Sequence, residues 1–586
     1  MEEVENENES KYKVVVGIDF GSYGCGYAYS FMNENKIYHS DIDGADVDKK
    51  VPTEIILDDK NQILQFGAKC KEYLKNKGLN AGHYFKGIKM HLYQQKTTIK
   101  SSNSNKELSL QIVIEKVLEK LKDLCLDQLN KSYKYIEESL IKWVVTVPAI
   151  WGDFEKGIMM EACQNIGLIG EEDDKSLFFA LEPEAASLYC SKNDAIRKEF
   201  LETGKYYIIC DLGGGTGDIV THLVGSNSHL EEITPSCGGA YGSNEIDKKI
   251  FSQIIKELFG YENFNDLLLK YNELEIREDL NVIYDDWCNL ERDIKSFKEG
   301  CTLEKVNNNE KYPISCVVFE DFFEEKGLND LVVKYNDNLF DDNLKLSVRS
   351  EKKWIVEFPY KIIYNYIEEQ SEAICYEIKK IHSDSKIDID TIIFVGGYCS
   401  NEVLISKIKN NLGEKYFYMQ PSNPCLAIME GAVLFGLNPS AIDIRIAKYT
   451  IGMETQSEWN EELHSQNGTK IYDEVDEIWR CEECFYKFVE VNQKLKYNES
   501  VEPGSFRMVE PRSALLKFYQ TKKPNPIFTF EEGVDKIIER ELDAKKDYPP
   551  EERGFKVEMK FGGTFFDVKA VHEKSGNFIK INLKYE

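Results

Sequence analysis

Two glycine-rich turns, each beside an aspartate, are the parts of this sequence best suited to chemistry. The first is residues 19–22 (DFGS), and the second is residues 211–218 (DLGGGTGD). Glycine adopts conformations that expose successive backbone N–H groups, and such a nest of amides attracts phosphate oxygens. Carboxylates hold hydrated Mg²⁺. Facing each other across a cleft, the two turns would grip a triphosphate and its metal from both sides.

Each turn also has a simpler interpretation. A strand, a glycine turn and a second strand form an ordinary β-hairpin, and Gly396-Gly397, after a third apolar strand, is typical of packing turns between a strand and a helix. The presence of all three turns in this order favours a nucleotide site over three unrelated turns.

The expected elements place these turns at the ends of buried strands. Residues 13–30 and 205–224 share one layout, in which an apolar strand, an acidic residue and a glycine-rich turn precede a second strand. This repetition predicts two related lobes that face each other. Hydrophobic periodicity predicts further buried strands over 142–147 and 391–395, and amphipathic helices over 110–124 and up to Leu412.

The sequence changes character after about Pro439. Apolar and charged residues alternate over 555–561 and 579–585, which predicts antiparallel strands. We expect a separate, mostly β domain over 446–586, with a short acidic helix near 530–545.

Composition excludes several classes of function. The 586 residues include 73 Lys and Arg against 102 Asp and Glu, and the net charge of −29 disfavours nucleic acid and anionic membranes as partners. Hydrophobic residues make up 42% of the chain, enough for folded cores. Residues 1–12 are expected to form an acidic disordered tail. No apolar run suits a membrane span, and 15 scattered cysteines indicate free thiols in a reducing compartment. We expect a cytoplasmic protein, with a nuclear location left open.

The motifs resemble those of a known family. The three turns are similar to the phosphate-1, phosphate-2 and adenosine motifs of the actin-like ATPase superfamily, and more closely to those of the 70 kDa heat shock proteins. The segments TVPAIW (146–151) and EPEAA (182–186) agree with that family. GGAYGS (238–243) and GAVLFGL (431–437) are similar to its divergent protein 12 branch.

This resemblance implies an α/β fold with two duplicated ribonuclease H-like lobes around a nucleotide cleft, followed by the mostly β domain. Lobe I would span 13–203, with 425–445 returning to it, and lobe II would span 204–424. The implied ligands are ATP or ADP and Mg²⁺.

The resemblance also implies metal-binding and water-positioning roles. Asp19, Glu182 and Asp211 would hold Mg²⁺, mostly through water, and Glu182 would alternatively orient the attacking water. Thr216 and Asp218 would position that water. Phosphoryl transfer of this kind depends on positioning and charge stabilisation.

Nucleotide contacts are implied at further positions. Lys89, or alternatively Lys86, would neutralise charge on the γ-phosphate, and Glu291 with Lys295 would reach the ribose and base. An ordinary solvated surface remains the alternative for these side chains. The turn residues implied in nucleotide binding are Gly21, Ser22, Tyr23, Gly213, Gly214, Gly215, Gly238, Gly239, Gly396 and Gly397.

The chain departs from the family in several places. Ser22 and Tyr23 stand where the family has two threonines, Ser400 replaces a common adenine-stacking arginine, and Cys425 replaces a usual acid. Neither an Asp-Leu-rich linker nor a long helical lid follows the ATPase region, so the usual peptide-folding cycle is not expected.

Cys481 and Cys484 form a lone C-x-x-C motif. Zinc sites usually combine such a pair with a second pair or with histidines. The motif has no second pair and no histidine at ligand spacing, so a zinc site is not favoured.

The leading functional hypothesis is a slow Mg²⁺-dependent ATPase that acts as an atypical, chaperone-like conformational switch, with a protein partner or client at the C-terminal domain. The alternative is a nucleotide-sensing scaffold that does not hydrolyse ATP, which Tyr23 and Ser400 favour. A small-molecule kinase of the same superfamily is the third hypothesis, and the TVPAIW and EPEAA segments argue against it.

Overall fold

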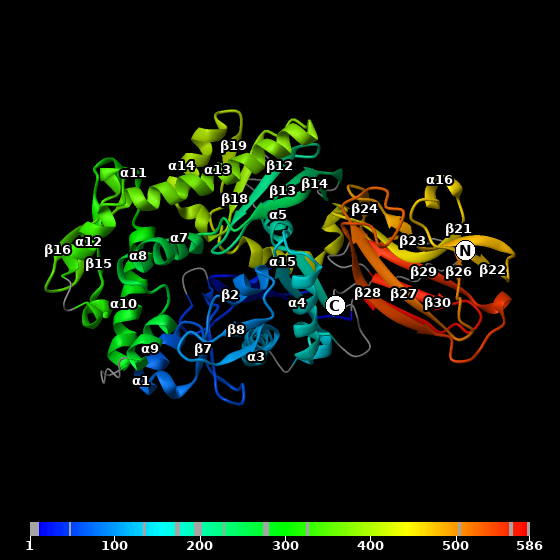
Figure 1. Cartoon of the computed structure of the whole chain (residues 1–586), viewed down its shortest axis with the longest axis horizontal. Coiled ribbons are helices and arrows are strands. Elements are labelled where there is room, and N and C mark those ends of the chain that lie inside the picture. Colours follow the sequence, from blue (N-terminus) through cyan, green and yellow to red (C-terminus); the bar gives the residue numbers. More distant parts are fainter. Residues whose placement is uncertain are drawn as a thin grey trace.

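The computed structural model of the chain is a mixed α/β structure with several sheets and many helices (Figure 1). It describes residues 11–34, 36–45, 49–132, 136–169, 176–192, 202–226, 229–273, 280–323, 327–501, 505–561 and 567–582. All but the last two residues of the expected tail, 1–12, lie outside this part. None of the helices it describes is long and apolar enough to cross a membrane.

Sheet I is built around β1 (Val14–Phe20), all of whose residues are buried. The strand order is β11-β10-β1-β2-β3, with β4 also paired to β2. β1 runs antiparallel to β2 and parallel to β10, and β10 runs parallel to β11. The other strands are β2 (Gly24–Phe31), β3 (Tyr38–His39), β4 (Val51–Pro52), β10 (Ile141–Val147) and β11 (Leu177–Leu181).

Sheet II repeats this arrangement around β12 (Tyr206–Leu212). Its order is β19-β18-β12-β13-β14-β20-β24, and β12 is antiparallel to β13 and parallel to β18, as β1 is to β2 and β10. The other strands are β13 (Gly217–Val224), β14 (Leu230–Gly239), β18 (Thr391–Val395), β19 (Phe417–Met419), β20 (Ile442–Ile446) and β24 (Lys494–Lys496). The expected strands at 142–147 and 391–395 are confirmed.

Two helices, α5 (Glu182–Lys192) and α15 (Ala427–Leu437), lie between the sheets. They share one core with Val15 of sheet I and Ile209 of sheet II. The helices cross closely, since a Cβ at Gly431 would lie 1.8 Å from the Ala185 carbonyl oxygen. The returning segment 425–445 therefore divides: α15 packs against β1, whereas β20 joins sheet II.

Further helices cover the outer faces of the sheets. The helix expected over 110–124 is confirmed as α3 (Leu110–Ser132), and the one ending at Leu412 is α14 (Glu402–Leu412). The other helices used below or packed against the sheets are α1 (Lys69–Lys77), α2 (Ile88–Tyr93), α4 (Asp153–Asn165), α7 (Asn244–Lys249), α9 (Phe264–Glu273), α10 (Leu280–Glu299), α12 (Leu328–Asn336) and α13 (Tyr360–Ser385).

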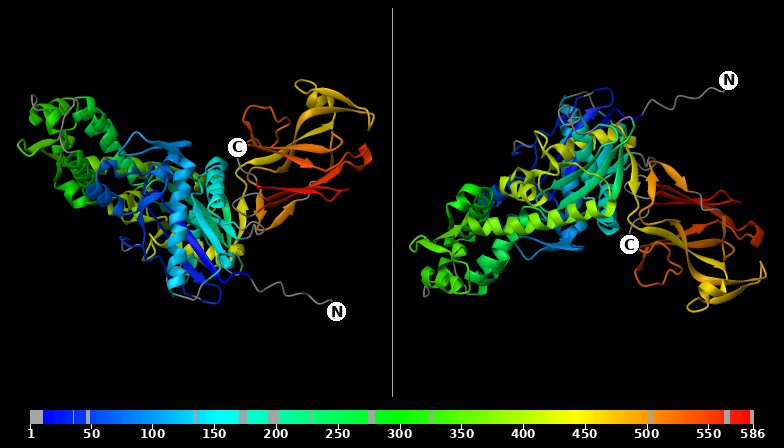
Figure 2. Two further views of the ribbon diagram at one scale, coloured as in Figure 1. Left: turned by 90° about the horizontal axis from the view of Figure 1, so that it is seen from below. Right: turned by 90° about the horizontal axis from the view of Figure 1, so that it is seen from above.

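The C-terminal strands form two packed sheets at one end of the molecule, opposite the end that carries α10 and α12 (Figures 1 and 2). The first has the order β22-β23-β21-β27-β28, and in the second β25-β29-β30-β31 is joined by β26. Their bounds are β21 (Thr450–Glu458), β22 (Lys470–Asp473), β23 (Ile478–Val489), β25 (Glu499–Val501), β26 (Ser505–Arg507), β27 (Ser513–Thr521), β28 (Val534–Asp543), β29 (Gly554–Phe561), β30 (Asp567–His572) and β31 (Phe578–Asn582).

The short acidic helix expected near 530–545 is wrong, because this segment is the strand β28. Its antiparallel pairing with β27 places Phe518 opposite Ile538, and Ile537, Ile538 and Leu542 are buried. Burial in a sandwich core outweighs the helical preference of the Glu, Arg and Lys residues in this segment.

Candidate functional site

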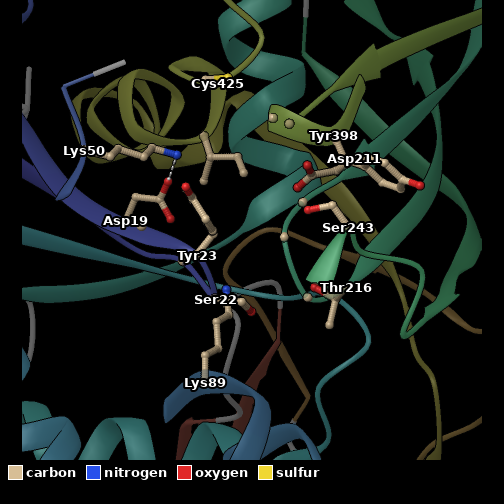
Figure 3. A pocket seen from close by; sticks show the side chains of 18 of the residues that line it. Asp19, Ser22, Tyr23, Lys50, Lys89, Asp211, Thr216, Ser243, Tyr398 and Cys425 are labelled. Atoms are coloured by element: carbon tan, nitrogen blue, oxygen red, sulfur yellow. Dashed lines mark ion pairs between the residues drawn. The ribbon is translucent and has the colours of Figure 1, made fainter. Parts of the chain in front are cut away.

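A cavity of about 520 Å³ lies where the ends of β1 and β12 meet. Backbone segments 21–24, 213–216 and 396–398 line it (Figure 3). Small-molecule sites in proteins typically measure about 300–1,000 Å³. The three glycine-rich turns singled out in the sequence therefore converge on one cavity of ligand size.

Asp19 and Asp211 occupy equivalent positions in the two sheets. Each is the penultimate residue of its strand, β1 or β12, and each is buried and lines the cavity. Because β1 and β12 have the same place in sheets of the same topology, the two carboxylates approach the cavity from either side (Figure 3).

The turns that follow these strands contact each other. A Cβ at Gly214 would lie 2.7 Å from the Tyr23 Cβ, and one at Gly215 would lie 2.5 Å from the Ser22 Oγ. Glycine is therefore required for the approach. In the second turn, the Gly213 N–H donates to the Thr216 carbonyl oxygen at 3.0 Å.

The carboxylates in and behind the cavity form a crowded, buried group. Burial raises the pKa of Asp211 well above its ordinary value, and the charges of Glu182, Asp218 and Asp19 raise it further. Burial also raises the pKa of Glu182, to about 7, although Lys89 opposes that shift. Because like charges repel strongly in a buried site, a cation bound here would stabilise the ionised group.

The donor set fits Mg²⁺. Asp19, Glu182 and Asp211 all line the cavity, and within the described part of the chain the Oδ1 atom of Asp211 is buried without a hydrogen-bond partner. Mg²⁺ prefers carboxylate oxygens and water. An unpartnered buried carboxylate oxygen in a cavity with two further carboxylates is such an environment.

Of the two candidate lysines, Lys89 reaches the cavity. It lies on α2, is only 2% exposed and forms an ion pair with Glu182. Lys86 instead pairs with Glu291 at 2.5 Å and does not line the cavity.

Lys50 was not predicted as a site residue. Its Nζ lies 2.6 Å from the Oδ2 of Asp19 inside the cavity (Figure 3). Although burial lowers it, contact with Asp19 raises the pKa of Lys50 above its ordinary value, so the ammonium is charged. A charged ammonium on Asp19 competes with a metal ion for the same carboxylate.

Tyr23 and Lys295 meet across the mouth of the cavity. The Tyr23 hydroxyl accepts a hydrogen bond from the Nζ of Lys295, which also lies 4.9 Å from the centre of the tyrosine ring. Tyr23 belongs to the first turn and Lys295 to α10, so this contact joins sheet I to the helices packed on sheet II.

Three predicted residues lie behind the cavity and do not line it. The Oδ1 of Asp218 accepts a hydrogen bond from the Ile150 N–H at 2.9 Å. Gly238 and Gly239 pair with Asp218 and Gly217 across β13 and β14. These residues pack around the second hairpin, and their roles toward nucleotide and water stay predictions.

Glu291 also lies outside the cavity, where α10 meets α1 and the loop before α2. Its carboxylate contacts Lys71 at 3.0 Å, Lys86 at 2.5 Å and the Trp287 Nε1 at 3.0 Å. Although burial raises it, the charges of Lys86 and Lys71 hold the pKa of Glu291 well below its ordinary value. This residue links α10 to α1 and to the loop before α2.

Several lining residues were missed by sequence reasoning. Ser243 ends the GGAYGS segment, and Tyr398 and Asn401 follow Gly396-Gly397, so position in a motif was a usable signal for these three. No such signal marks Lys50. The other lining side chains not predicted are Val51, Pro52, Lys298, Glu299 and Ile428. Both departures from the family, Ser400 and Cys425, line the cavity as well.

Comparison with known proteins gives matches along almost the whole chain. The chain is 24% identical over 647 residues to heat shock 70 kDa protein 12A of Mus musculus, covering 98% of this chain and 92% of the relative. It is 24% identical to heat shock 70 kDa protein 12B of Homo sapiens, covering 100% of this chain and 92% of the relative. The resemblance to the heat shock 70 kDa protein 12 branch is thereby confirmed.

Another match covers only half of the chain and is to a protein named as a chaperone. A chaperone protein HscA homologue of Rickettsia bellii is 25% identical over 302 residues, which cover 50% of this chain and 46% of that protein. No protein-family model matches the chain. The chain thus aligns almost from end to end with relatives of the protein 12 branch.

Proposed function

We propose that this protein binds ATP or ADP in the cavity between sheets I and II and hydrolyses ATP slowly with Mg²⁺. The sheets would be the two lobes of an actin-like ATPase, over about 13–203 with α15 and about 204–424. The observation that carries the proposal is the pair of matching hairpins: two strands with the same topological position end in glycine-rich turns, and each contributes one buried carboxylate.

The lining residues of the cavity have different roles in this proposal. The turns 21–24 and 213–216 provide the backbone that faces phosphate groups, and Asp19, Glu182 and Asp211 would hold Mg²⁺. Bound Mg²⁺ supplies charge neutralisation at the phosphates. Lys89 adds positive charge for the γ-phosphate, and the Thr216 hydroxyl orients the attacking water.

A chaperone-like switch is the role that these features support best. The relatives carry heat-shock and chaperone names, and the C-terminal sandwich offers a surface for a protein partner or client. The connection to the sandwich contacts several parts of the ATPase. Arg445 pairs with Glu184 of α5 at 2.7 Å, the Ile446 N–H donates to Glu232 of β14 at 2.8 Å, and Lys448 donates to the Ala149 carbonyl oxygen.

A scaffold that binds nucleotide without hydrolysis is the second candidate, and the ion pair between Lys50 and Asp19 favours it. An ammonium 2.6 Å from a proposed metal ligand neutralises that ligand. If the pair persists when nucleotide binds, the cavity would hold ATP with a weakened metal site.

The proposal is tested by measuring ATP binding and phosphate release together on the pure full-length chain with Mg²⁺. We expect both, and we expect Asp211→Asn to lower phosphate release at least about tenfold, because Asp211 would stabilise charge at the metal. The matched control is Asp535→Asn, which changes an exposed aspartate of the sandwich.

Each outcome selects one hypothesis. ATP binding without phosphate release or ADP formation supports the scaffold. Formation of ADP and a phosphorylated acceptor, without free phosphate and only when a sugar or other acceptor is added, supports a kinase. Unchanged turnover in a folded Asp211→Asn variant would exclude a metal role for this residue.

A further inference from the structure

The C-x-x-C motif lies on β23, in the sandwich and apart from sheets I and II (Figure 1). In a regular strand, residues three apart point to opposite faces. Here Thr455 and Ser457 of β21 lie opposite Cys484 and Cys481, so β23 carries one extra residue, and Glu483 has a φ of 53°. This is a β-bulge. It turns Cys484 toward the side of the strand that Cys481 occupies.

A histidine completes the group, which corrects the expectation from the sequence that none is near. His464 ends the short helix α16 (Glu461–His464), in the loop between β21 and β22. Its ring nitrogen and the two Sγ atoms all lie within 4.8 Å of one another. The histidine has no second cysteine or histidine beside it in the sequence, so only the folded chain shows that it joins the cysteine pair.

The three side chains are enclosed. Cys481 is 0% exposed, Cys484 is 5% and His464 is 5%. With Phe528 and the half-buried Trp459, the cysteines form a small apolar cluster separate from the main sandwich core. His464 contacts both aromatic rings, at centroid distances of 5.6 Å to Trp459 and 5.9 Å to Phe528.

We propose that Cys481, Cys484 and His464 bind a thiophilic divalent cation, zinc in the first instance. Two thiolates and an imidazole are ligands that zinc prefers, with Zn–S bonds of about 2.3 Å and Zn–N bonds of about 2.0 Å. In a tetrahedral site these lengths place ligand atoms about 3.5 Å apart or slightly more. The observed group needs only a small contraction, and water fills the fourth position. Both thiol protons pass to solvent.

The histidine ring must change one hydrogen bond when the cation binds. Its Nδ1 accepts the Asn460 N–H at 3.0 Å, so in the neutral ring the proton is on Nε2. Coordination through either nitrogen needs a lone pair there. Metal binding therefore displaces the Asn460 contact or reverses the tautomer, and the tautomer becomes a signature of occupancy.

The cation would tie the loop between β21 and β22 to the sheet. This loop already packs closely on the motif, because a Cβ at Gly468 would lie 2.7 Å from the Cys481 Sγ. In a cluster with so few apolar side chains, a bound metal replaces a hydrophobic core as the source of stability.

The test uses the reduced full-length protein, stripped of metal and then titrated with Zn²⁺ and separately with Co²⁺. We expect about one tightly bound equivalent, and with Co²⁺ the visible bands and thiolate charge-transfer band of a tetrahedral site. Cys481→Ser and His464→Asn should weaken binding by at least about tenfold. The matched control, Cys288→Ser, changes a half-buried thiol on α10 and should bind as the wild type does.

Other results would overturn the proposal. Folded, reduced protein that retains no zinc and shows no Co²⁺ bands excludes the site. A disulfide between Cys481 and Cys484 in protein purified under mild reduction, with no metal bound after full reduction, identifies a redox pair instead. Because metal content and Co²⁺ bands are measured on the wild type, the test stands even if a variant fails to fold.

Discussion

Lys50 and Asp19 form an ion pair that competes with metal binding at the proposed site. The Asp19 side chain is 2% exposed and the Lys50 side chain is 18% exposed, so the pair is largely shielded from solvent. A buried ammonium and a divalent cation cannot both be held close to one carboxylate without mutual repulsion. Lys50 must therefore withdraw from Asp19 if Mg²⁺ is to approach it.

The variant Lys50→Met tests this competition. We expect the Mg²⁺ concentration for half-maximal phosphate release to fall about tenfold, equivalent to about 1.4 kcal/mol. Without Mg²⁺ the variant should melt at a lower temperature, because a buried carboxylate has lost its partner, and Mg²⁺ should restore the melting temperature. Titration of phosphate release and a thermal melt with and without Mg²⁺ provide the measurements.

The control for Lys50→Met is Lys69→Met, which removes an exposed ion pair with Asp43 and should leave both readouts unchanged. Loss of phosphate release at saturating Mg²⁺ in a folded Lys50→Met protein would show that Lys50 itself acts on the nucleotide.

Site residues that belong to a sequence motif could be predicted, whereas those that only the folding of the chain brings to the site could not. Asp19 and Asp211 could be predicted because each lies between an apolar strand and a glycine turn. Lys50 lies in an ordinary charged stretch, and only the pairing of β4 with β2 brings it to Asp19. His464 is likewise brought to Cys481 by the fold.

At the element scale, Glu291 of α10 links this helix to α1 and to the loop before α2. Its contacts with Lys71 and Lys86 are well shielded, since the Glu291 side chain is 17% exposed. The same helix carries Lys295, which lines the cavity and contacts Tyr23 of the first turn. Weakening the Glu291 contacts would therefore loosen a helix that lines the cavity.

We expect Glu291→Gln to speed dissociation of a fluorescent ATP analogue by about tenfold, because removing one partner of a shielded charge group is costly. Stopped-flow displacement measures the rate. Asp285→Asn is a matched control, since Asp285 pairs with Lys75 between the same helices, α1 and α10, at a more exposed position, where such pairs contribute little. Equal effects of the two substitutions would exclude a special role for Glu291.

His222 of β13 is buried, and its side chain contacts α5. Its Nδ1 lies 2.8 Å from the Ser187 Oγ. Burial lowers the pKa of His222 from 6.5 to about 4. Between these two pH values, His222 is protonated in the unfolded chain and neutral in the folded protein. The free energy of unfolding therefore falls as pH falls. Above the upper value both states are neutral and the effect vanishes.

The variant His222→Gln lacks this titration. When the pH falls from neutral to about 4, the free energy of unfolding of the wild type should fall by up to about 3 kcal/mol more than that of the variant. Urea unfolding of both proteins at several pH values measures the difference, with His229→Gln, half-exposed at the end of the β13–β14 turn, as the control. A difference between wild type and variant that stays constant with pH would contradict the prediction.

Element prediction succeeded where apolar patterning and pairing agree. The helix that begins at Leu110 has the predicted type because its apolar residues face one core. The strand at 391–395 has it because its apolar residues alternate between two cores, one on each face of sheet II. The segment near 530–545 was assigned to the wrong type. Its Val534–Asp543 strand has mixed charges typical of a helix, and the partner that makes it a strand, β27, is distant in the sequence.

At the scale of the whole molecule, two sheets of the same topology meet at one cavity, and the sandwich is attached near that junction (Figure 2). β20 and β24 extend sheet II toward the sandwich, and the segment 445–448 contacts α5, β14 and the loop after β10. A change in how the sheets sit relative to each other would therefore be transmitted to the sandwich through this connection.

Nucleotide can drive such a change only through a difference in affinity for the two arrangements. Asp19 and the turn 21–24 belong to sheet I, and Asp211 and the turn 213–216 to sheet II, so a ligand that contacts both favours the closed arrangement. ATP carries a γ-phosphate that both turns and Lys89 would contact in the proposed site. ADP lacks this group.

Hydrogen exchange of the two turns tests this account most directly. With Mg²⁺ present, ATP should protect the backbone amides of 21–24 and of 213–216 more strongly than ADP does, and both turns should respond together. Equal protection by ATP and ADP, or protection of one turn alone, would contradict a clamp formed by two sheets around the γ-phosphate.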